Sequence, residues 1–355
     1  MKDNQPKTTE ASINIRYALM SMGASATCAY VLFKSLAGSV SADKASVLIV
    51  LFNIIAVMLR PIVSIFADRV ENKHTGVRLG TILIVLGYFF PVCFGISAKI
   101  VILALGSCIF HSFASSSILS RGNGQSIGIS LFLGGSVIGL AVYTFSPFLC
   151  HFLTLLLIIC AVPDDTCEIS EDDNTLVSSS ASPVITIASA ILLLTSYSML
   201  FYGFSSLSFD WAGFFKTDCL ILASIGIGRA LGGIVSDKLG RLFNVCAGAI
   251  GGSAIIVFCS DSKNLCLIGL MLLSMPLGSM ITALSKRSIK NSGFIFALFS
   301  SFAYLGQELT FYAKLKAPTV LLLIAICSVL ATACAEAPEV LRLIKNVKGV
   351  KNEAD

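Results

Sequence analysis

The chain has 355 residues, of which 55% are apolar and only 13% are Asp, Glu, Lys or Arg, and its mean hydropathy is +0.88. Soluble globular proteins carry about 25% charged residues, so about half of the usual charge is missing. This composition excludes an ordinary soluble enzyme, a disordered protein and a nucleic-acid-binding protein, despite the formal net charge of +5. We therefore expect a membrane protein of many spans that lies in the lipid bilayer.

Twelve apolar stretches have the length of a bilayer-crossing helix, which needs about 20 residues. They fall into two blocks of six. The first block is 13–34, 45–67, 77–97, 100–119, 125–143 and 145–162, and the second is 184–206, 218–236, 242–260, 264–284, 292–313 and 317–336. The sequence therefore predicts an all-α membrane protein with a six-helix bundle at 1–162, an acidic and serine-rich linker at 163–183, a second six-helix bundle at 184–336 and a basic tail at 337–355.

The basic residues set the orientation of these spans, because cytoplasmic loops carry an excess of Lys and Arg. Of the 25 Lys and Arg, 16 fall on the side of the N-terminus and seven on the other side, while Arg60 and Arg229 lie within spans. We expect both termini, the linker and the tail to be cytoplasmic, in a plasma membrane. The fully polar N-terminal segment shows no secretory signal pattern.

The remaining composition argues against bound cofactors and catalysis. The twelve cysteines are scattered without the paired spacing of a disulfide framework or a zinc site. The sequence contains no glycine-rich phosphate loop, no metal-spaced His and Cys set and no nucleophile motif. We expect no metal, no cofactor, no enzymatic activity and no binding of nucleic acid.

The two blocks repeat a charged pattern. Arg60 precedes Asp68 by eight residues at the end of the second span, and Arg229 precedes Asp237 by eight residues at the end of the eighth. Both pairs are offset by 169 positions along the chain (237 − 68 and 229 − 60). Two parallel repeats of six spans predict two helical bundles that face each other across a central cavity.

The second copy of this pattern resembles a known signature. The run Gly233-Ile-Val-Ser-Asp237-Lys238-Leu-Gly240-Arg241 is similar to the loop motif of the major facilitator superfamily, and the copy around Asp68 and Arg69 lacks both of its glycines. The resemblance implies two six-helix bundles related by a pseudo-two-fold axis, which rock about a central substrate site. It also implies that Asp68 and Asp237 act in a gate, each facing the first residues of a helix in the opposite half, at 291–292 and 125–126.

A narrower resemblance rests on residues 106–112, 121–128 and 134–139, with Met275-Pro276 and Phe52-Asn53. These runs are similar to the fosmidomycin-resistance-like branch of the superfamily. The branch resemblance favours export slightly over import.

Glu308 is the one acidic residue that falls clearly within a predicted span. It follows Ser292 by 16 residues, which is about 24 Å along a helix and places it in the outer third of the membrane. A carboxyl group there could load a proton near neutral pH and couple proton flow to transport. The alternatives are an ion pair with Lys34 or a hydrogen bond between helices.

Arg60 and Arg229 lie about 12 Å from their loop acids along the helix. One interpretation is that they hold an anionic substrate from both halves, because arginine side chains grip carboxylates and phosphates. The other interpretation is that they are structural and brace the loop motif, as arginine at this place resembles a common feature of the superfamily.

Other polar residues are candidates for the cavity. His111 lies about 18 Å deep in its span and could relay protons, bind substrate or be an ordinary core residue. By analogy with the superfamily, the substrate-facing candidates also include Asn53, Tyr30, Tyr197 and Gln307. His151 is expected to be structural, and His74 is expected to lie in a loop.

The sequence thus predicts a monomeric secondary active transporter that moves a small organic solute together with protons. A facilitator without ion coupling remains an alternative, to be preferred if Lys34 neutralises Glu308. A membrane sensor or scaffold with the same fold is the third reading, and the intact second loop motif argues against it.

Overall fold

The structure is a computed structural model, and it describes residues 10–36, 38–91, 95–122, 124–163, 183–209, 211–212, 215–312 and 317–352. All regular secondary structure within these ranges is helical. The predicted linker falls almost entirely on residues outside them.

The first half of the chain forms six helical segments. They are α1 (Glu10–Ala29) with the π-helical turn η1 (Tyr30–Ser35); α2 (Ala42–Asn53) with η2 (Ile54–Met58) and α3 (Arg60–Arg69); α4 (Lys73–Phe89); α5 (Ile96–Arg121); α6 (Ile127–Phe145); and α7 (Leu149–Ala161).

The second half repeats this pattern. Its segments are α8 (Pro183–Ser206); α9 (Phe215–Leu239); α10 (Arg241–Val245) with η5 (Cys246–Gly251) and α11 (Gly252–Phe258); α12 (Lys263–Ser274) with α13 (Pro276–Ser285); the 3₁₀ turn η6 (Ile289–Asn291) before α14 (Ser292–Tyr312); and α15 (Ala317–Asn352).

Each of the twelve predicted spans coincides with one of these segments, and the predicted fold class is confirmed. The short break between α6 and α7 falls where the Ser146-Pro147 step predicts a turn. The main difference is at the C-terminus, where α15 continues to Asn352, well past the predicted end of the last span at 336.

The prediction that His74 lies in a loop is wrong. Asn72 caps α4, because its side chain accepts a hydrogen bond from the backbone N–H of Thr75. The helix therefore begins at Lys73, and His74 in its first turn is only 5% exposed.

Eight of the described helical segments are long and apolar enough to cross a membrane. The four other predicted spans are too short or too polar to be counted among these eight. α4 and α7 have 17 and 13 residues, α1 includes Glu10, Asn14 and Arg16, and α14 includes Gln307 and Glu308.

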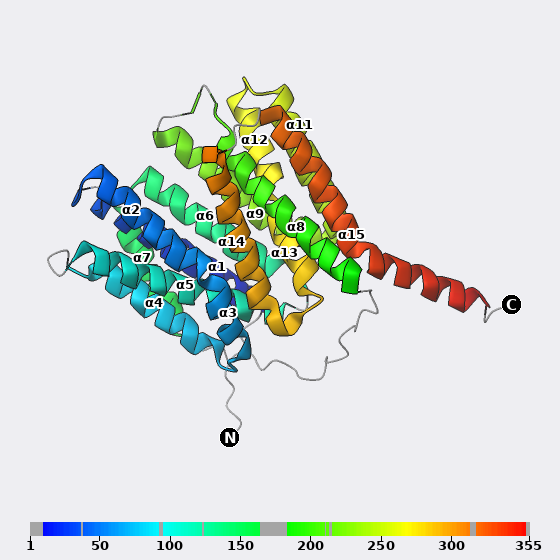
Figure 1. The fold of residues 1–355 in the computed structure, drawn as a ribbon, viewed down its shortest axis with the longest axis horizontal. Helices are drawn as coiled ribbons and strands as arrows, with labels where there is room; N and C mark the ends of the chain where they lie inside the picture. The colour runs from blue at the N-terminus through cyan, green and yellow to red at the C-terminus, as the bar shows by residue number, and fades with distance from the viewer. Residues whose placement is uncertain are drawn as a thin grey trace.

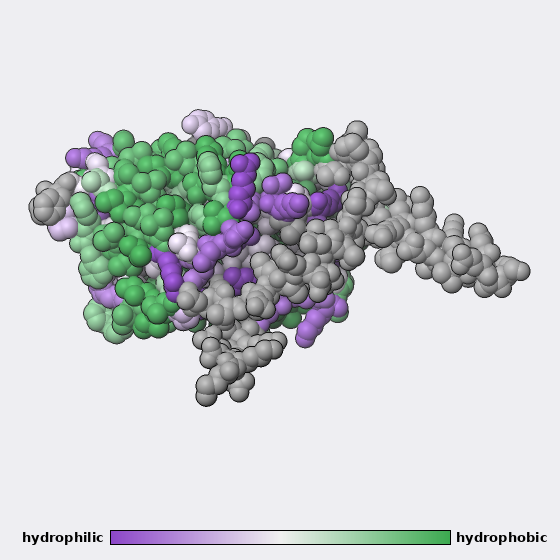
Figure 2. Space-filling view, turned by 90° about the horizontal axis from the view of Figure 1, so that it is seen from below, coloured by the Kyte–Doolittle hydropathy of each residue, from purple (hydrophilic) through white to green (hydrophobic). Residues whose placement is uncertain are grey.

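The outer surface of the molecule fits a bilayer. Large apolar side chains such as Phe66, Phe89, Phe152 and Leu322 are more than half exposed. Soluble monomers rarely show such extensive apolar surface, whereas lipid requires it. On the face in Figure 2, hydrophilic residues gather in a band beside broad hydrophobic surface. The protein is therefore a membrane protein.

The two halves lie side by side, and α6, α9 and α14 form most of the contact between them (Figure 1). α6 packs along α9, and α14 packs against α3 and α5. Gly134 and Gly226 face each other at the α6–α9 contact, where a Cβ on Gly134 would come within 2.7 Å of the Gly226 carbonyl oxygen.

Glycines also bring helices together within each half. A Cβ on Gly139 of α6 would lie 2.2 Å from the carbonyl oxygen of Met22 in α1. A Cβ on Gly232 of α9 would lie 2.1 Å from the carbonyl oxygen of Met275, between α12 and α13. Small residues at these points allow the backbones to approach closely, as in other membrane bundles.

This packing predicts that Gly139→Ala lowers the thermal unfolding temperature of the purified protein. The added methyl group overlaps the α1 backbone, and such overpacking costs about 1–3 kcal/mol. Gly251→Ala is the matched control, because no atom lies within 4 Å of its Cβ position. Equal unfolding temperatures for the two variants would contradict the packing argument.

Candidate functional site

Asp68, at the end of α3, caps a helix of the opposite half. Its carboxylate accepts hydrogen bonds from the backbone N–H of Gly293 and of Phe294, each at 2.9 Å, in the first turn of α14. The hydroxyl of Ser116 in α5 donates a third bond at 2.6 Å. Gly293 makes this approach feasible, because a Cβ there would lie 2.6 Å from Asp68 Oδ1.

Asp237, at the end of α9, makes the equivalent contact in the other direction. Its two oxygens accept hydrogen bonds from the backbone N–H of Ser126 at 2.7 Å and of Ile127 at 2.9 Å, where α6 begins. Gly233 lies one turn earlier, and a Cβ on it would meet the Cα of Ile127 at 2.7 Å. The glycine of the loop motif therefore lets α9 approach the start of α6.

Both expected contacts are thus present, and they are related by the internal repeat. The first N–H groups of a helix have no partner within the helix and carry partial positive charge, so a carboxylate is their natural acceptor. We call the end of the bundle that carries Asp68 and Asp237 the gate side. In this structure the two halves are joined at the gate side by these two caps.

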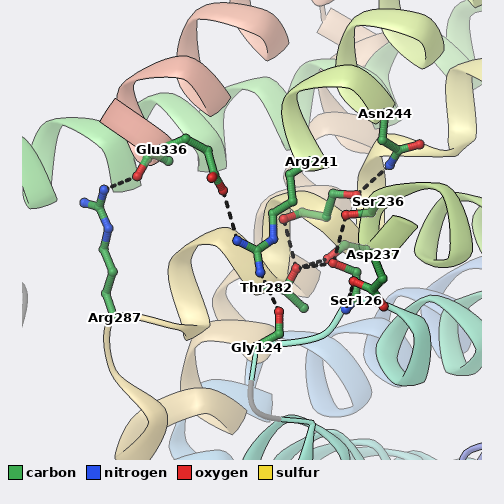
Figure 3. A network of polar contacts seen from close by, with 12 residues as sticks. Gly124, Ser126, Ser236, Asp237, Arg241, Asn244, Thr282, Arg287 and Glu336 are labelled. Carbon is green, nitrogen blue, oxygen red and sulfur yellow. Dashed lines mark hydrogen bonds and ion pairs between the residues drawn. The ribbon is translucent and has the colours of Figure 1, made fainter. Parts of the chain in front are cut away.

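A wider polar network surrounds Asp237 (Figure 3). The hydroxyl of Ser126 lies 3.1 Å from that of Ser236 and 2.7 Å from that of Thr282. Arg241 forms an ion pair with Glu336 of α15 at 3.0 Å and also donates to the carbonyl oxygen of Gly124 in the first half. The motif arginine thereby links α10, α15 and the loop before α6.

The sequence predicts Arg241 as part of the motif and the helix start at Ser126 as the partner of Asp237. It does not predict that Glu336, Ser236 and Thr282 belong to the same network. Glu336 offered one signal, since it is an acidic residue at the end of an otherwise apolar span. Lys238 and Arg69, also part of the motif, are exposed. Gly240 has a φ of +94° at the break between α9 and α10, a backbone conformation that favours glycine.

Arg60 owes its position to a break in its helix. The π-helical turn η2 separates α2 from α3, and Pro61 in the first turn of α3 has no N–H to donate to the carbonyl of Val57. Ser301 of α14 donates to that carbonyl oxygen at 3.2 Å. Arg60 itself is 7% exposed, and its Nε donates to the carbonyl oxygen of Ala56.

Arg229 is the equivalent residue in α9 and is also 7% exposed. Its guanidinium lies over the ring of Phe201 in α8, 5.3 Å from the centroid. Its Nε has no hydrogen-bond partner among the described residues.

Tyr197 of α8 connects the two arginines. Its phenol group is 2% exposed and interacts electrostatically with both Arg60 and Arg229. The ring of Tyr197 packs on Phe299 of α14, with 4.9 Å between centroids. We call Arg60, Arg229 and Tyr197 the arginine–tyrosine cluster; it draws one arginine from each half.

The described contacts of the two arginines do not include the loop acids. Both oxygens of Asp68 and of Asp237 bind helix N–H groups instead. The interpretation in which Arg60 and Arg229 brace the loop motif therefore has no contact to support it in the described part of the chain.

His111 lies beside this cluster. Its Nδ1 is 2.9 Å from the carbonyl oxygen of Ser107 and donates to it, and its ring packs edge-on against Phe132 of α6 at 5.6 Å between centroids. Phe132 in turn contacts Phe296 of α14 in the other half. Arg60 is an electrostatic neighbour of His111. The histidine is therefore adjacent to the interface between the halves.

Glu308 lies partly buried in α14, one turn after Tyr304. Glu308 and Asn53, which lies at the end of α2 in the opposite half, are both close neighbours of the Tyr304 hydroxyl. Among the described residues no ion pair joins Glu308 to Lys34, which is exposed. The structure thus brings together Asn53 and Glu308 but not Glu308 and the lysine.

Two other candidates lie apart from the arginines. The ring of Tyr30 packs on His151 and Tyr88, beside a cavity of about 440 Å³ between α1, α4 and α7. The His151 side chain hydrogen bonds with the Tyr88 hydroxyl, in keeping with a structural role. Gln307 is exposed on α14.

Comparison with solved structures identifies the architecture. A crystal structure described as the major facilitator superfamily transporter FucP in the outward conformation matches 92% of this chain and 98% of its own, with a TM-score of 0.61 and 12% identity. The chain has the major facilitator superfamily fold.

Two further solved structures support the same fold. A variant of the Escherichia coli fucose:proton symporter FucP gives a TM-score of 0.64 at 11% identity, with 92% of this chain and 98% of that chain covered. The human organic anion transporter MFSD10 (TETRAN) gives 0.57 at 12% identity, with 94% and 99% covered. No family model and no curated protein matches the chain.

The paired caps predict a crossed pattern of hydrogen–deuterium exchange in nanodiscs. Asp237→Asn should speed exchange of the amides at 126–127 more than that of the amides at 293–294, and Asp68→Asn should do the reverse. A lost cap costs about 0.5–2 kcal/mol, which corresponds to about two- to thirty-fold faster exchange.

Each variant serves as the control for the other. If neither substitution changed exchange at its own helix start, the caps would contribute nothing to closure of the gate side.

Proposed function

We propose that this protein is a secondary active transporter that moves a small organic solute by alternating access. The observation that supports this most directly is the pair of caps, Asp68 on α14 and Asp237 on α6. They join the two halves at one end of the bundle through a few hydrogen bonds at the surface of each helix start. Such contacts can break and reform without disturbing the core of either half.

The fold neighbours are consistent with this role. One is described as a fucose:proton symporter and another as an organic anion transporter. Neither identity is high enough to transfer a substrate, and the two descriptions name chemically different solutes. The transporter role is therefore the shared element, and the resemblance to the fosmidomycin-resistance-like branch favours export.

We further propose that transport is coupled to protons through Glu308. Its carboxyl group and Asn53 of the other half are both neighbours of Tyr304, so a change in its protonation can alter a contact between the halves. An uncoupled facilitator based on neutralisation by Lys34 lacks the necessary ion pair among the described residues. His111 is a second candidate for proton transfer, next to Arg60.

The remaining features of the proposal follow the sequence analysis. The protein would act as a monomer in the plasma membrane, with the gate side and both termini in the cytoplasm. The proposed role requires no cofactor or metal and involves no enzymatic step.

Alternating access predicts that the centre of the molecule can be reached in turn from both sides of the membrane. Cys108 of α5 is a native reporter, since it is buried and is an electrostatic neighbour of Arg60. A membrane-impermeant thiol reagent should modify Cys108 in vesicles of either orientation, as quantified by mass spectrometry of its peptide.

A cross-link on the gate side distinguishes access to Cys108 from the two sides of the membrane. The hydroxyls of Ser126 and Ser236 lie 3.1 Å apart across the halves, so a Ser126→Cys and Ser236→Cys pair should form a disulfide that holds the gate side closed. Oxidation should abolish modification from the gate side, leave it intact from the other side, and be reversed by reductant. Modification of wild-type protein from one side only would contradict alternating access.

Proton coupling predicts that the ratio of Cys108 modification from the two sides of the membrane changes with pH in the wild-type protein. Glu308→Gln should abolish this change, because the amide cannot exchange a proton. Asp261→Asn, which alters an exposed loop acid, is the control. An unchanged pH response in Glu308→Gln would exclude Glu308 as the coupling group.

A further inference from the structure

The arginine–tyrosine cluster holds two positive charges that no acidic residue in the described part of the chain balances. Arg60 and Arg229 are each 93% buried, since only 7% of either is exposed. The electrostatic neighbours of Arg60 include Cys108, Tyr197 and Cys28, and that of Arg229 is Tyr197. Phenol and thiol groups are neutral at pH 7 in their ordinary state. No carboxylate accompanies either guanidinium in the described residues.

Their hydrogen-bonding capacity is also largely unused. A guanidinium offers five N–H donors. The Nε of Arg60 donates one bond, to the carbonyl oxygen of Ala56, and the Nε of Arg229 is buried without an acceptor among the described residues. Buried charges are normally paired, because an unpaired one loses its hydration without replacement. These two residues therefore have N–H donors that a bound anion could accept from.

Charged groups on the gate side have more hydrogen-bonding partners than Arg60 and Arg229 have among the described residues. Arg241, on the gate side, has both an acid and a carbonyl as partners. Asp68 and Asp237 have two helix N–H groups each. The buried charges at the centre lack the partners that the less buried charges at the gate possess.

We propose that the transported solute is a small organic anion whose carboxylate or phosphate group binds between Arg60 and Arg229. This inference rests on the proposed transporter function and names its substrate class. Guanidinium groups bind planar carboxylates and phosphates through two parallel N–H···O bonds. Tyr197, an electrostatic neighbour of both arginines, carries a hydroxyl that can donate a further bond, and its ring packs against Phe201 and Phe299.

The arrangement also connects binding to movement. Arg60 belongs to the first half and Arg229 to the second, so one anion contacts both halves at once. An anion between them removes the cost of two unpaired buried cations and favours the conformations in which both arginines reach it. Solute binding and the position of the halves are then linked through the same two side chains.

The test measures binding of matched anionic and neutral probes to the purified full-length protein. The pairs are succinate and succinamide, benzoate and benzamide, and glycerol 3-phosphate and glycerol, with 1,4-diaminobutane as the cation. Thermal stabilisation is recorded over a concentration series for each probe. We expect at least one anion to stabilise wild-type protein, its neutral counterpart to be at least about tenfold weaker, and the cation to have no effect.

Variants assign the effect to the cluster. Arg60→Gln and Arg229→Gln should each weaken the anion by about tenfold or more, and Arg229→Lys by less, since lysine keeps the charge but loses the fork. The control is the double variant Lys44→Gln with Lys263→Gln, which removes one exposed positive charge from each half and should bind as wild type does. Each glutamine variant without ligand should unfold at a higher temperature than wild type, because it lacks one unpaired buried charge.

The results separate this inference from the transporter proposal. It is overturned if no anion stabilises the protein, if neutral probes bind as well as anions, or if binding survives the loss of both arginines. Lower unfolding temperatures for the ligand-free glutamine variants, with anion binding retained, would assign the arginines a structural role. Failure in any of these ways leaves alternating access to be judged by the Cys108 experiment alone.

Discussion

The structure depends on carboxylates that cap helices belonging to the other half of the molecule. Asp68 binds the start of α14 and Asp237 binds the start of α6, each through two backbone N–H groups. Because the exposed N–H groups of a helix start need acceptors, each half completes the hydrogen bonding of the other. The close approach of α9 to α6 at Gly233 follows from the same contact.

In the proposed transport cycle, these caps form a contact that opens and closes. Each is worth about 0.5–2 kcal/mol, which is small beside the packing that holds either half together. When the halves separate at the gate side, water can hydrate both the carboxylate and the helix start, so neither group is left unsatisfied. Thr282, Ser236 and Ser126 are hydroxyl residues and can exchange their mutual bonds for water in the same way.

Charge is distributed differently at the gate and at the centre. At the gate, Arg241 and the two aspartates have partners within the protein. At the centre, Arg60 and Arg229 are buried beside Tyr197 without an acid. The helix break at η2 and Pro61 places Arg60 there, and its repeat partner occupies the equivalent depth in α9. The contrast explains why the central charges, and not the more numerous peripheral ones, are assigned to the solute.

The sequence by itself determined the twelve helical segments, because about 20 apolar residues must form hydrogen-bonded helix in a bilayer. It also determined the paired gate acids, since the repeat and the loop motif are local patterns. Only the tertiary structure decided that Glu308 and Asn53 are both neighbours of Tyr304 and that no ion pair joins Glu308 to Lys34 among the described residues. It also decided that Tyr30 packs with His151 and that Glu336 pairs with Arg241. These contacts join residues distant in sequence, and helical period alone does not fix the rotation of one span against another. The same limit applied to Arg60 and Arg229, whose depth was readable from the sequence. Their shared neighbour Tyr197, and the lack of an acidic partner among the described residues, depended on how the helices of the two halves pack.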